Sequence, residues 1–146
     1  PADIRAYLSK VSGPLLDRID IQIEVSPLSF DELSKLAPSR SSADMRTDVN
    51  KARAFALKRF LRDGKKLRCN AELSPADLRK YCTLDDEATA IMRAAFENMG
   101  LSARGYDRIL RVARTIADLE ESENIKAHHI AEAVQLRSLD RKYWQR

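Results

Sequence analysis

The strongest helical pattern in the chain is Leu101-Ser-Ala-Arg-Gly-Tyr-Asp-Arg-Ile-Leu-Arg-Val-Ala-Arg-Thr-Ile-Ala-Asp-Leu-Glu120. Its apolar residues recur mostly at three- and four-residue steps, which is the spacing of one helix face. Ser102 stands just before them, and serine readily accepts hydrogen bonds from the N–H groups of a first helical turn. The stretch therefore predicts an amphipathic helix that begins after Ser102 and buries Tyr106, Ile109, Leu110, Ala113, Ile116, Ala117 and Leu119.

Three arginines of this stretch, Arg104, Arg108 and Arg111, recur at four- and three-residue steps on a second face. Arg104 falls in the first turn, where the positive end of the helix dipole disfavours a cation. A cation there needs an acid beside it or an anion in front of it, and a guanidinium at a helix N-terminus binds phosphate well. A solvent-exposed arginine on a basic helix is the alternative, and spacing alone favours that alternative.

The composition of the 146 residues is that of one globular domain, or of one domain plus a fragment. The net charge of +4 comes from 26 basic and 22 acidic residues, so it points only weakly to a polyanionic partner. No apolar run approaches the ~18 residues of a membrane span, so we expect no membrane partner. Cys69 and Cys82 form no CxxC pattern, which predicts free thiols in a reducing cytoplasm.

The rest of the chain is predicted to be mainly α-helical. Helices are expected over residues 4–11, 30–36, 43–61, 75–81, 85–99 and 126–136, with Ser42 and Ser74 as two of the caps and Gly100 as a stop. The segment Ile21–Val25 alternates apolar and polar residues and is the one predicted strand. Because a single strand cannot make a sheet, we expect it to pair with a missing part of a larger protein or with another copy.

Arg18 lies between Asp17 and Asp20, just ahead of the predicted strand. One interpretation is a local ion pair that fixes a turn, and surface pairs of that kind contribute little to stability. The other is an arginine that reaches across a subunit boundary to a phosphate of the neighbour. Local spacing does not separate the two, and the ion pair is the more common outcome.

Two further clusters have ordinary structural interpretations. His128 and His129 are consecutive on a predicted helix, so their side chains diverge by about 100°. We expect one of them to be packed and the other exposed, and neither to be a metal ligand. The densest basic patch is Lys65, Lys66 and Arg68, with Arg59 and Arg62 nearby. It lacks interleaved aromatic residues for base stacking, so a solvated turn is favoured over nucleic-acid contact.

Three blocks of sequence carry a family resemblance. They are Ser12-Gly-Pro-Leu-Leu-Asp-Arg-Ile-Asp20, Leu101 to Asp118 of the stretch quoted above, and His129-Ile-Ala-Glu-Ala-Val-Gln-Leu-Arg-Ser-Leu-Asp-Arg141. In this order they resemble the C-terminal part of the bacterial magnesium-chelatase-like AAA+ ATPases of the competence-protein type. The resemblance covers nearly the whole chain. It implies that residues 1–26 end the α/β ATPase core, as a helix plus one strand, and that residues 27–146 form the helical lid.

The resemblance also implies roles for the two unusual arginines. Arg18, in Leu-Leu-Asp-Arg-Ile-Asp, matches an arginine finger that acts in trans on the γ-phosphate bound by the neighbouring subunit. Arg104, in Leu-Ser-Ala-Arg, matches the sensor-2 arginine, which contacts the nucleotide of its own subunit. The usual sensor-2 pattern is Gly-x-Arg, so the assignment of Arg104 depends on the form found in this subfamily. No residue is expected to bind a metal.

ATP and Mg²⁺ are expected as cofactors of the whole protein, not as firm ligands of this chain. No GxxxxGK[ST] phosphate-binding run occurs in it. The expected partners are a missing N-terminal ATPase core and the other subunits of a homo-oligomeric cytoplasmic ring. DNA is a possible partner, because competence-type relatives resemble helicase-like motors. The alternative is a non-enzymatic helical nucleic-acid-binding module that uses Lys65 and Lys66 and binds DNA tightly with a steep salt dependence.

Overall fold

The computed structural model describes residues 15, 18–23, 25–34 and 39–137. Within this part the elements are α3 (Phe30–Ser34), α4 (Ser42–Arg62), the 3-10 helix η1 (Asn70–Glu72), α5 (Pro75–Tyr81), α6 (Asp86–Met99), α7 (Ala103–Leu119) and α8 (Ala127–Gln135). The prediction of a mainly α-helical chain is confirmed, and the described residues contain no sheet. The helix predicted over residues 4–11 lies outside them. Among the described helices, none has the length and apolar character needed to cross a membrane.

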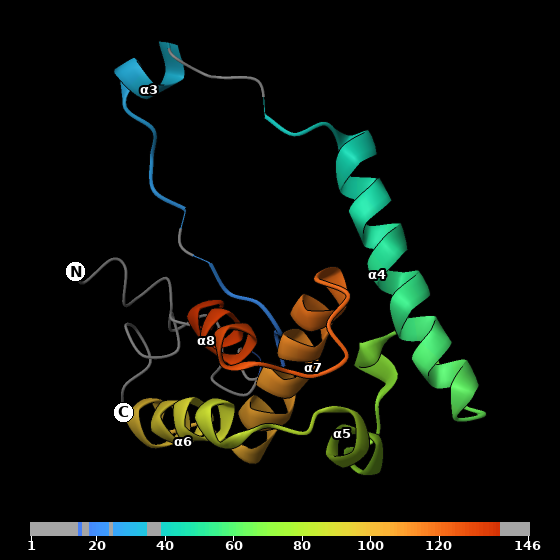
Figure 1. Cartoon of the computed structure of the whole chain (residues 1–146). Coiled ribbons are helices and arrows are strands. Elements are labelled where there is room, and N and C mark those ends of the chain that lie inside the picture. The colour runs from blue at the N-terminus through green and yellow to red at the C-terminus, as the bar shows by residue number, and fades with distance from the viewer. Residues whose placement is uncertain (1–14, 16–17, 24, 35–38, 138–146) are drawn as a thin grey trace.

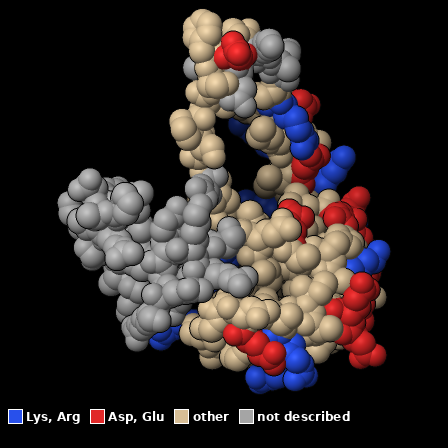
Figure 2. Space-filling view, turned by 90° about the vertical axis from the view of Figure 1, so that its left-hand side faces the viewer, with Lys and Arg blue, Asp and Glu red and all other residues tan. Residues whose placement is uncertain are grey.

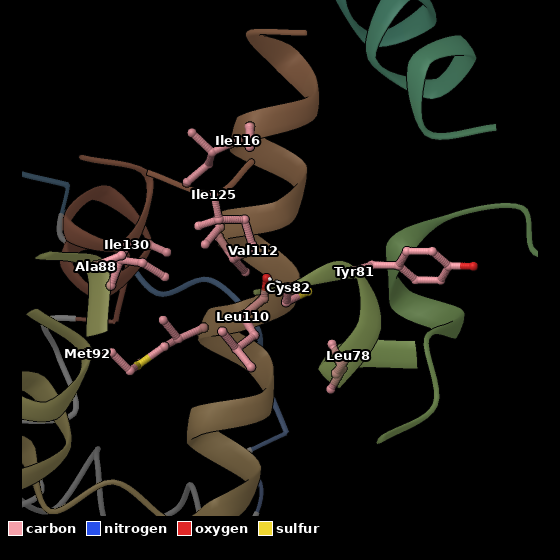
Figure 3. Close-up of a cluster of buried hydrophobic side chains, with 14 of the residues drawn as sticks. Leu78, Tyr81, Cys82, Ala88, Met92, Leu110, Val112, Ile116, Ile125 and Ile130 are labelled. Carbon is pink, nitrogen blue, oxygen red and sulfur yellow. Dashed lines mark hydrogen bonds between the residues drawn. The ribbon is translucent and has the colours of Figure 1, made fainter. Parts of the chain in front are cut away.

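Helix α7 is the centre of the fold. It packs against α8, α4, α5 and η1, and Figure 1 shows it between the first two of these helices and above α6. Figure 3 shows Leu110, Val112 and Ile116 of α7 between apolar side chains of α6 and α8 on one side and of α5 on the other. Ile109 of α7 is completely buried, and burying such a side chain stabilises the fold by about 1.5–3 kcal/mol. The predicted apolar face is therefore the core face, except that Leu119 is half exposed.

Side-chain caps set where α4, α5, α6 and α7 begin, and a glycine ends α6. Ser102 accepts a hydrogen bond from the N–H of Gly105 at 3.1 Å, which confirms the predicted start of α7. Gly100 ends α6 with φ of 60°, a conformation that glycine adopts without steric cost. The predicted cap of α4 was one residue late. Ser41 has the extended backbone and accepts from the N–H of Asp44 at 3.1 Å, whereas Ser42 is already the first helical residue.

The predicted strand Ile21–Val25 is wrong for the residues of it that the structure describes, 21–23 and 25. This segment is irregular, because no second strand lies beside it among the described residues. Its backbone instead makes one bond to the end of α8, from the N–H of Gln22 to the carbonyl oxygen of Leu136 at 2.6 Å. Ile23 and Val25 are exposed. The alternation of apolar and polar residues therefore occurs here without a regular strand in the part of the segment that the structure describes.

Acid should weaken the contacts of Asp77 that cap the start of α5. The Asp77 carboxylate accepts from Lys65 at 2.7 Å and from the hydroxyl of Ser74 at 2.6 Å, and these contacts lower its pKa from 3.8 to about 2. A carboxyl group whose pKa is lowered by folding stabilises the fold above its unfolded pKa and loses that contribution as the pH falls through the folded one. We expect Asp77→Asn to be less stable than wild type at pH 7 and to lose less stability between about pH 4 and 2.

Urea unfolding of both proteins at several pH values measures this difference. Glu97→Gln is the matched control, because Glu97 is an exposed carboxylate on α6. The prediction is wrong if, between about pH 4 and 2, the wild-type protein loses no more unfolding free energy than Asp77→Asn does.

Candidate functional site

Arg104 is an exposed cation at the N-terminal end of α7. The first turn of this helix contains no acidic residue, and no hydrogen bond or ion pair joins the Arg104 side chain to another described residue. Ser102 satisfies the N–H of Gly105, while the helix dipole keeps this end of α7 positive. Arg104 thus places a guanidinium without a described acidic partner at a positive helix end, an arrangement that suits an external anion such as phosphate.

The other two arginines of the same sequence pattern are occupied by the fold. Arg108 forms an ion pair between its Nη1 and Oδ1 of Asp20. Arg111 donates from Nη2 to the carbonyl oxygen of Leu73 at 2.9 Å. Their positions on one face were predicted, but their partners were not. Arg104 differs from both because it has no such partner among the residues that the structure describes.

Arg18 is exposed, and its backbone N–H bonds to the carbonyl oxygen of Leu15 at 3.0 Å in a turn. Asp20, one of the two acids of the predicted local ion pair, pairs with Arg108 instead. The other, Asp17, lies outside the described residues. The Arg18 guanidinium forms no hydrogen bond or ion pair with another described residue, and the structure does not pair it with the same phosphate-type site as Arg104.

The segment that follows Arg18 is held by the end of α8. Arg137 is completely buried and donates from Nη1 to the carbonyl oxygen of Ile19 at 2.7 Å. The carbonyl oxygen of Leu136 accepts from the N–H of Gln22 at 2.6 Å. Sequence reasoning missed these contacts. They join residues more than 100 positions apart, and nothing local distinguishes a buried arginine from a cation in a polar tail.

A buried polar cluster crosses the core between α4 and α7. The Asp118 carboxylate accepts from Arg59 at 2.6 and 3.0 Å, from Asn70 at 2.8 Å and from Arg114 at 3.1 Å. Arg114 also donates to the carbonyl oxygens of Ser122 and Glu123. The placement of Arg59 in an exposed basic patch was therefore wrong, because only 6% of this residue is exposed. One carboxylate faces two guanidinium groups here, so the cluster depends on Asp118.

The rest of the predicted basic patch is largely neutralised. Lys65 pairs with Asp77 at 2.7 Å, and Arg68 pairs with Glu72 at 2.8 Å. Lys66 is exposed and has no ion pair to a described acid. Figure 2 shows basic side chains next to acidic ones on the face that it displays. The patch is therefore mainly a set of surface ion pairs.

The histidine pair lies closer together than predicted. Nε2 of His128 and Nε2 of His129 both lie 3.0 Å from Oε2 of Glu120. These hydrogen bonds lower the pKa of the Glu120 carboxyl, the one to His128 more than the one to His129. The prediction that one ring is packed and one exposed is confirmed, His129 being buried. Three ligand-type atoms meet here. Nδ1 of His129 accepts from the N–H of Lys126 at 2.8 Å, which leaves Nε2 as the ring nitrogen that faces Glu120.

A groove of about 690 Å³ lies between α6 and α7, lined by Cys82, Leu84, Thr89, Met92, Arg93, Phe96, Glu97 and Tyr106. The rings of Phe96 and Tyr106 meet edge to face, with centroids 6.5 Å apart. Burial raises the pKa of Cys82 to about 12, so its thiol is protonated at neutral pH and is a poor nucleophile. The groove thus combines apolar side chains with the polar and charged side chains of Thr89, Arg93 and Glu97, and its cysteine is not an activated nucleophile.

Comparison with known proteins covers nearly the whole chain. Residues 39–137 match the family model for the C-terminal part of magnesium chelatase subunit ChlI, and residues 1–33 match the model for magnesium chelatase subunit ChlI. The chain is 37% identical to YifB of Escherichia coli over 142 residues and 38% identical to the competence protein ComM of Haemophilus influenzae over 142 residues. Each alignment covers 97% of this chain and 27% of the relative, so the chain spans about a quarter of their length.

Proposed function

The chain belongs to the magnesium chelatase ChlI family, and on that premise we propose that it is the C-terminal lid of an AAA+ ATPase. Residues 1–26 end the α/β core and residues 27–146 form the lid. Arg104 is the sensor-2 residue, which contacts a phosphate of the ATP bound by its own subunit. Arg18 is the arginine finger, which acts on the γ-phosphate held by the neighbouring subunit of a homo-oligomeric ring. The observation that carries the proposal is the exposed guanidinium of Arg104, which lies in a first turn without an acid and has no ion pair to a described residue.

The two arginines have different tasks in this mechanism. Arg104 can donate two parallel hydrogen bonds to phosphate oxygens, and the positive end of α7 strengthens that contact. Arg18 meets the charge that spreads over the transferring phosphoryl group, so it acts mainly on the transition state. ATP and Mg²⁺ are held by the missing N-terminal core, because this chain has no phosphate-binding loop. The chain alone therefore binds neither cofactor firmly.

We place the complete protein in the cytoplasm, as a motor that acts on DNA. The support is the similarity to a relative called a competence protein. Direct DNA binding by this chain has less support than the action of the complete protein on DNA. Lys65 and Arg68, which a nucleic-acid-binding loop would use, are engaged by Asp77 and Glu72.

Substitution of Arg104 tests the proposal. In the complete protein, Arg104→Ala should weaken nucleotide binding or hydrolysis by roughly ten- to hundredfold, since charge-assisted hydrogen bonds contribute about 1.5–3 kcal/mol each. In the isolated chain the same change should leave the melting temperature unchanged or slightly raised, because it removes a cation from a positive helix end. Nucleotide titration, ATP turnover and thermal unfolding of the two forms measure these effects.

Arg111→Ala is the matched control, with the opposite expected pattern. Arg111 lies on the same helix but donates to the carbonyl oxygen of Leu73. Its removal should lower the melting temperature and leave nucleotide binding nearly unchanged. The sensor-2 assignment fails if Arg104→Ala clearly destabilises the chain and leaves ATP turnover untouched.

A further inference from the structure

Three contacts attach the segment Ile19–Gln22 to α7 and α8. Arg137 donates to the carbonyl oxygen of Ile19, Gln22 donates to the carbonyl oxygen of Leu136, and Arg108 pairs with Asp20. All of them fall within four residues that directly follow Arg18. The segment is therefore attached to the helical body, although it has no regular secondary structure of its own.

The contact from α7 starts one helical turn after Arg104. Residues four apart lie on the same side of an α-helix, about one 5.4 Å turn from each other, so Arg104 and Arg108 share a face. Asp20, the partner of Arg108, is two residues from Arg18. The side chains of Arg108 and Asp20 are 22% and 47% exposed, and an ion pair this exposed contributes little to stability. If the pair had only a structural role, breaking it would therefore change the stability of the fold very little.

The contacts from α8 are more deeply buried. The exposed fraction of Arg137 is 0%, and that of Gln22 is 7%. Helices α7 and α8 pack directly against each other. The two sets of contacts thus tie the segment to one packed pair of helices, and α7 carries Arg104 at its N-terminal end.

We propose that Arg108 and Arg137 are positioning residues, which make the segment of the arginine finger follow the movement of the lid. This inference rests on the function proposed above. When Arg104 closes on a phosphate of its own subunit, α7 moves, and the Arg108–Asp20 pair carries that movement to Arg18. The exposed Arg18 side chain then enters or leaves the ATP site of the neighbouring subunit. Nucleotide bound in one subunit thereby sets the hydrolysis rate of the next.

Breaking the exposed ion pair in the complete protein tests the coupling. Arg108→Gln and Asp20→Asn should each lower kcat for ATP hydrolysis by about 10- to 100-fold, which is the effect of a small misplacement of a reacting group. The Kd for ATP should change less than about twofold, because the proposal gives neither residue a contact with nucleotide. The double variant Asp20→Arg with Arg108→Asp restores an ion pair and should recover most of the lost kcat.

Arg40→Gln is the matched control, since it breaks an exposed ion pair with Asp48 at the start of α4, and neither residue contributes to the three contacts of this segment. It should leave kcat unchanged. Arg137→Lys retains a charged donor toward Ile19 and should keep more activity than Arg137→Met. Hydrogen exchange at the Gln22 amide gives a readout that is independent of turnover, and it should be faster in Arg137→Met than in wild type.

The outcomes separate the coupling from the function on which it rests. If Arg18→Ala abolishes hydrolysis while Arg108→Gln and Asp20→Asn keep the wild-type kcat, the coupling is wrong and the arginine finger stands. If Arg18→Ala has no effect on hydrolysis, both proposals fail. A loss of kcat that the charge-exchanged double variant does not recover also overturns the coupling, because the loss then does not come from the broken ion pair.

Discussion

Arg18→Ala in the complete protein is expected to reduce kcat for ATP hydrolysis by about 10³–10⁵-fold, the range found for arginine fingers. Its Kd for ATP should stay close to that of wild type. The reason is that an arginine acting in trans meets charge that develops mainly in the transition state, not in bound ATP. The Arg18 side chain is exposed and forms no hydrogen bond or ion pair with another described residue. Its loss should therefore leave the melting temperature of the isolated chain unchanged.

Arg18→Lys is the control for charge alone. Lysine keeps the positive charge but loses the planar fork of donors, so we expect it to recover only a small part of the activity. Single-turnover and steady-state ATPase assays, together with nucleotide titration, measure kcat and Kd separately. A kcat for Arg18→Ala near that of wild type would return Arg18 to the interpretation of an ordinary surface cation.

Asp118→Ala is expected to cause the largest loss of stability, about 3–5 kcal/mol. Asp118 is 1% exposed and is the acid that Arg59 and Arg114 share. Its removal leaves two buried guanidinium groups facing each other without a counter-charge. Breaking a buried ion pair from one side is costly for this reason, even where the intact pair contributes little net stability. Urea unfolding of the isolated chain measures the free-energy difference.

Glu123→Ala is the control for Asp118. The Glu123 side chain is exposed, and only its backbone carbonyl contacts Arg114, so the substitution keeps that contact. We expect a change within about 0.5 kcal/mol. Asp118→Asn should be milder than Asp118→Ala, because an amide oxygen still accepts one of the hydrogen bonds. A loss below about 1 kcal/mol for Asp118→Ala would mean that water reaches the two arginines and replaces the carboxylate.

The positions of the helices follow from the sequence alone, because their signals are local. The apolar spacing after Ser102 predicted α7, and Ser74 with Pro75 predicted the start of α5. Gly100 ended α6 as expected, since a positive φ suits a residue without a side chain. The family also follows from the sequence, because the blocks that carry the resemblance are continuous stretches in a conserved order along this chain. The first-turn place of Arg104 belongs to the same group of local inferences.

The partners of the charged residues were decided only by tertiary structure. Arg59 looked like part of a basic surface, but the packing of α4 on α7 buries it against Asp118. Asp20 pairs with Arg108 and not with Arg18. Arg137 donates to the carbonyl oxygen of Ile19, which is 118 positions earlier in the chain. Helix periods report contacts within a few residues, whereas these pairs join positions 59 to 118 apart. The sequence does not show whether a long arginine side chain is solvated or buried, so its partner is known only from the packed fold.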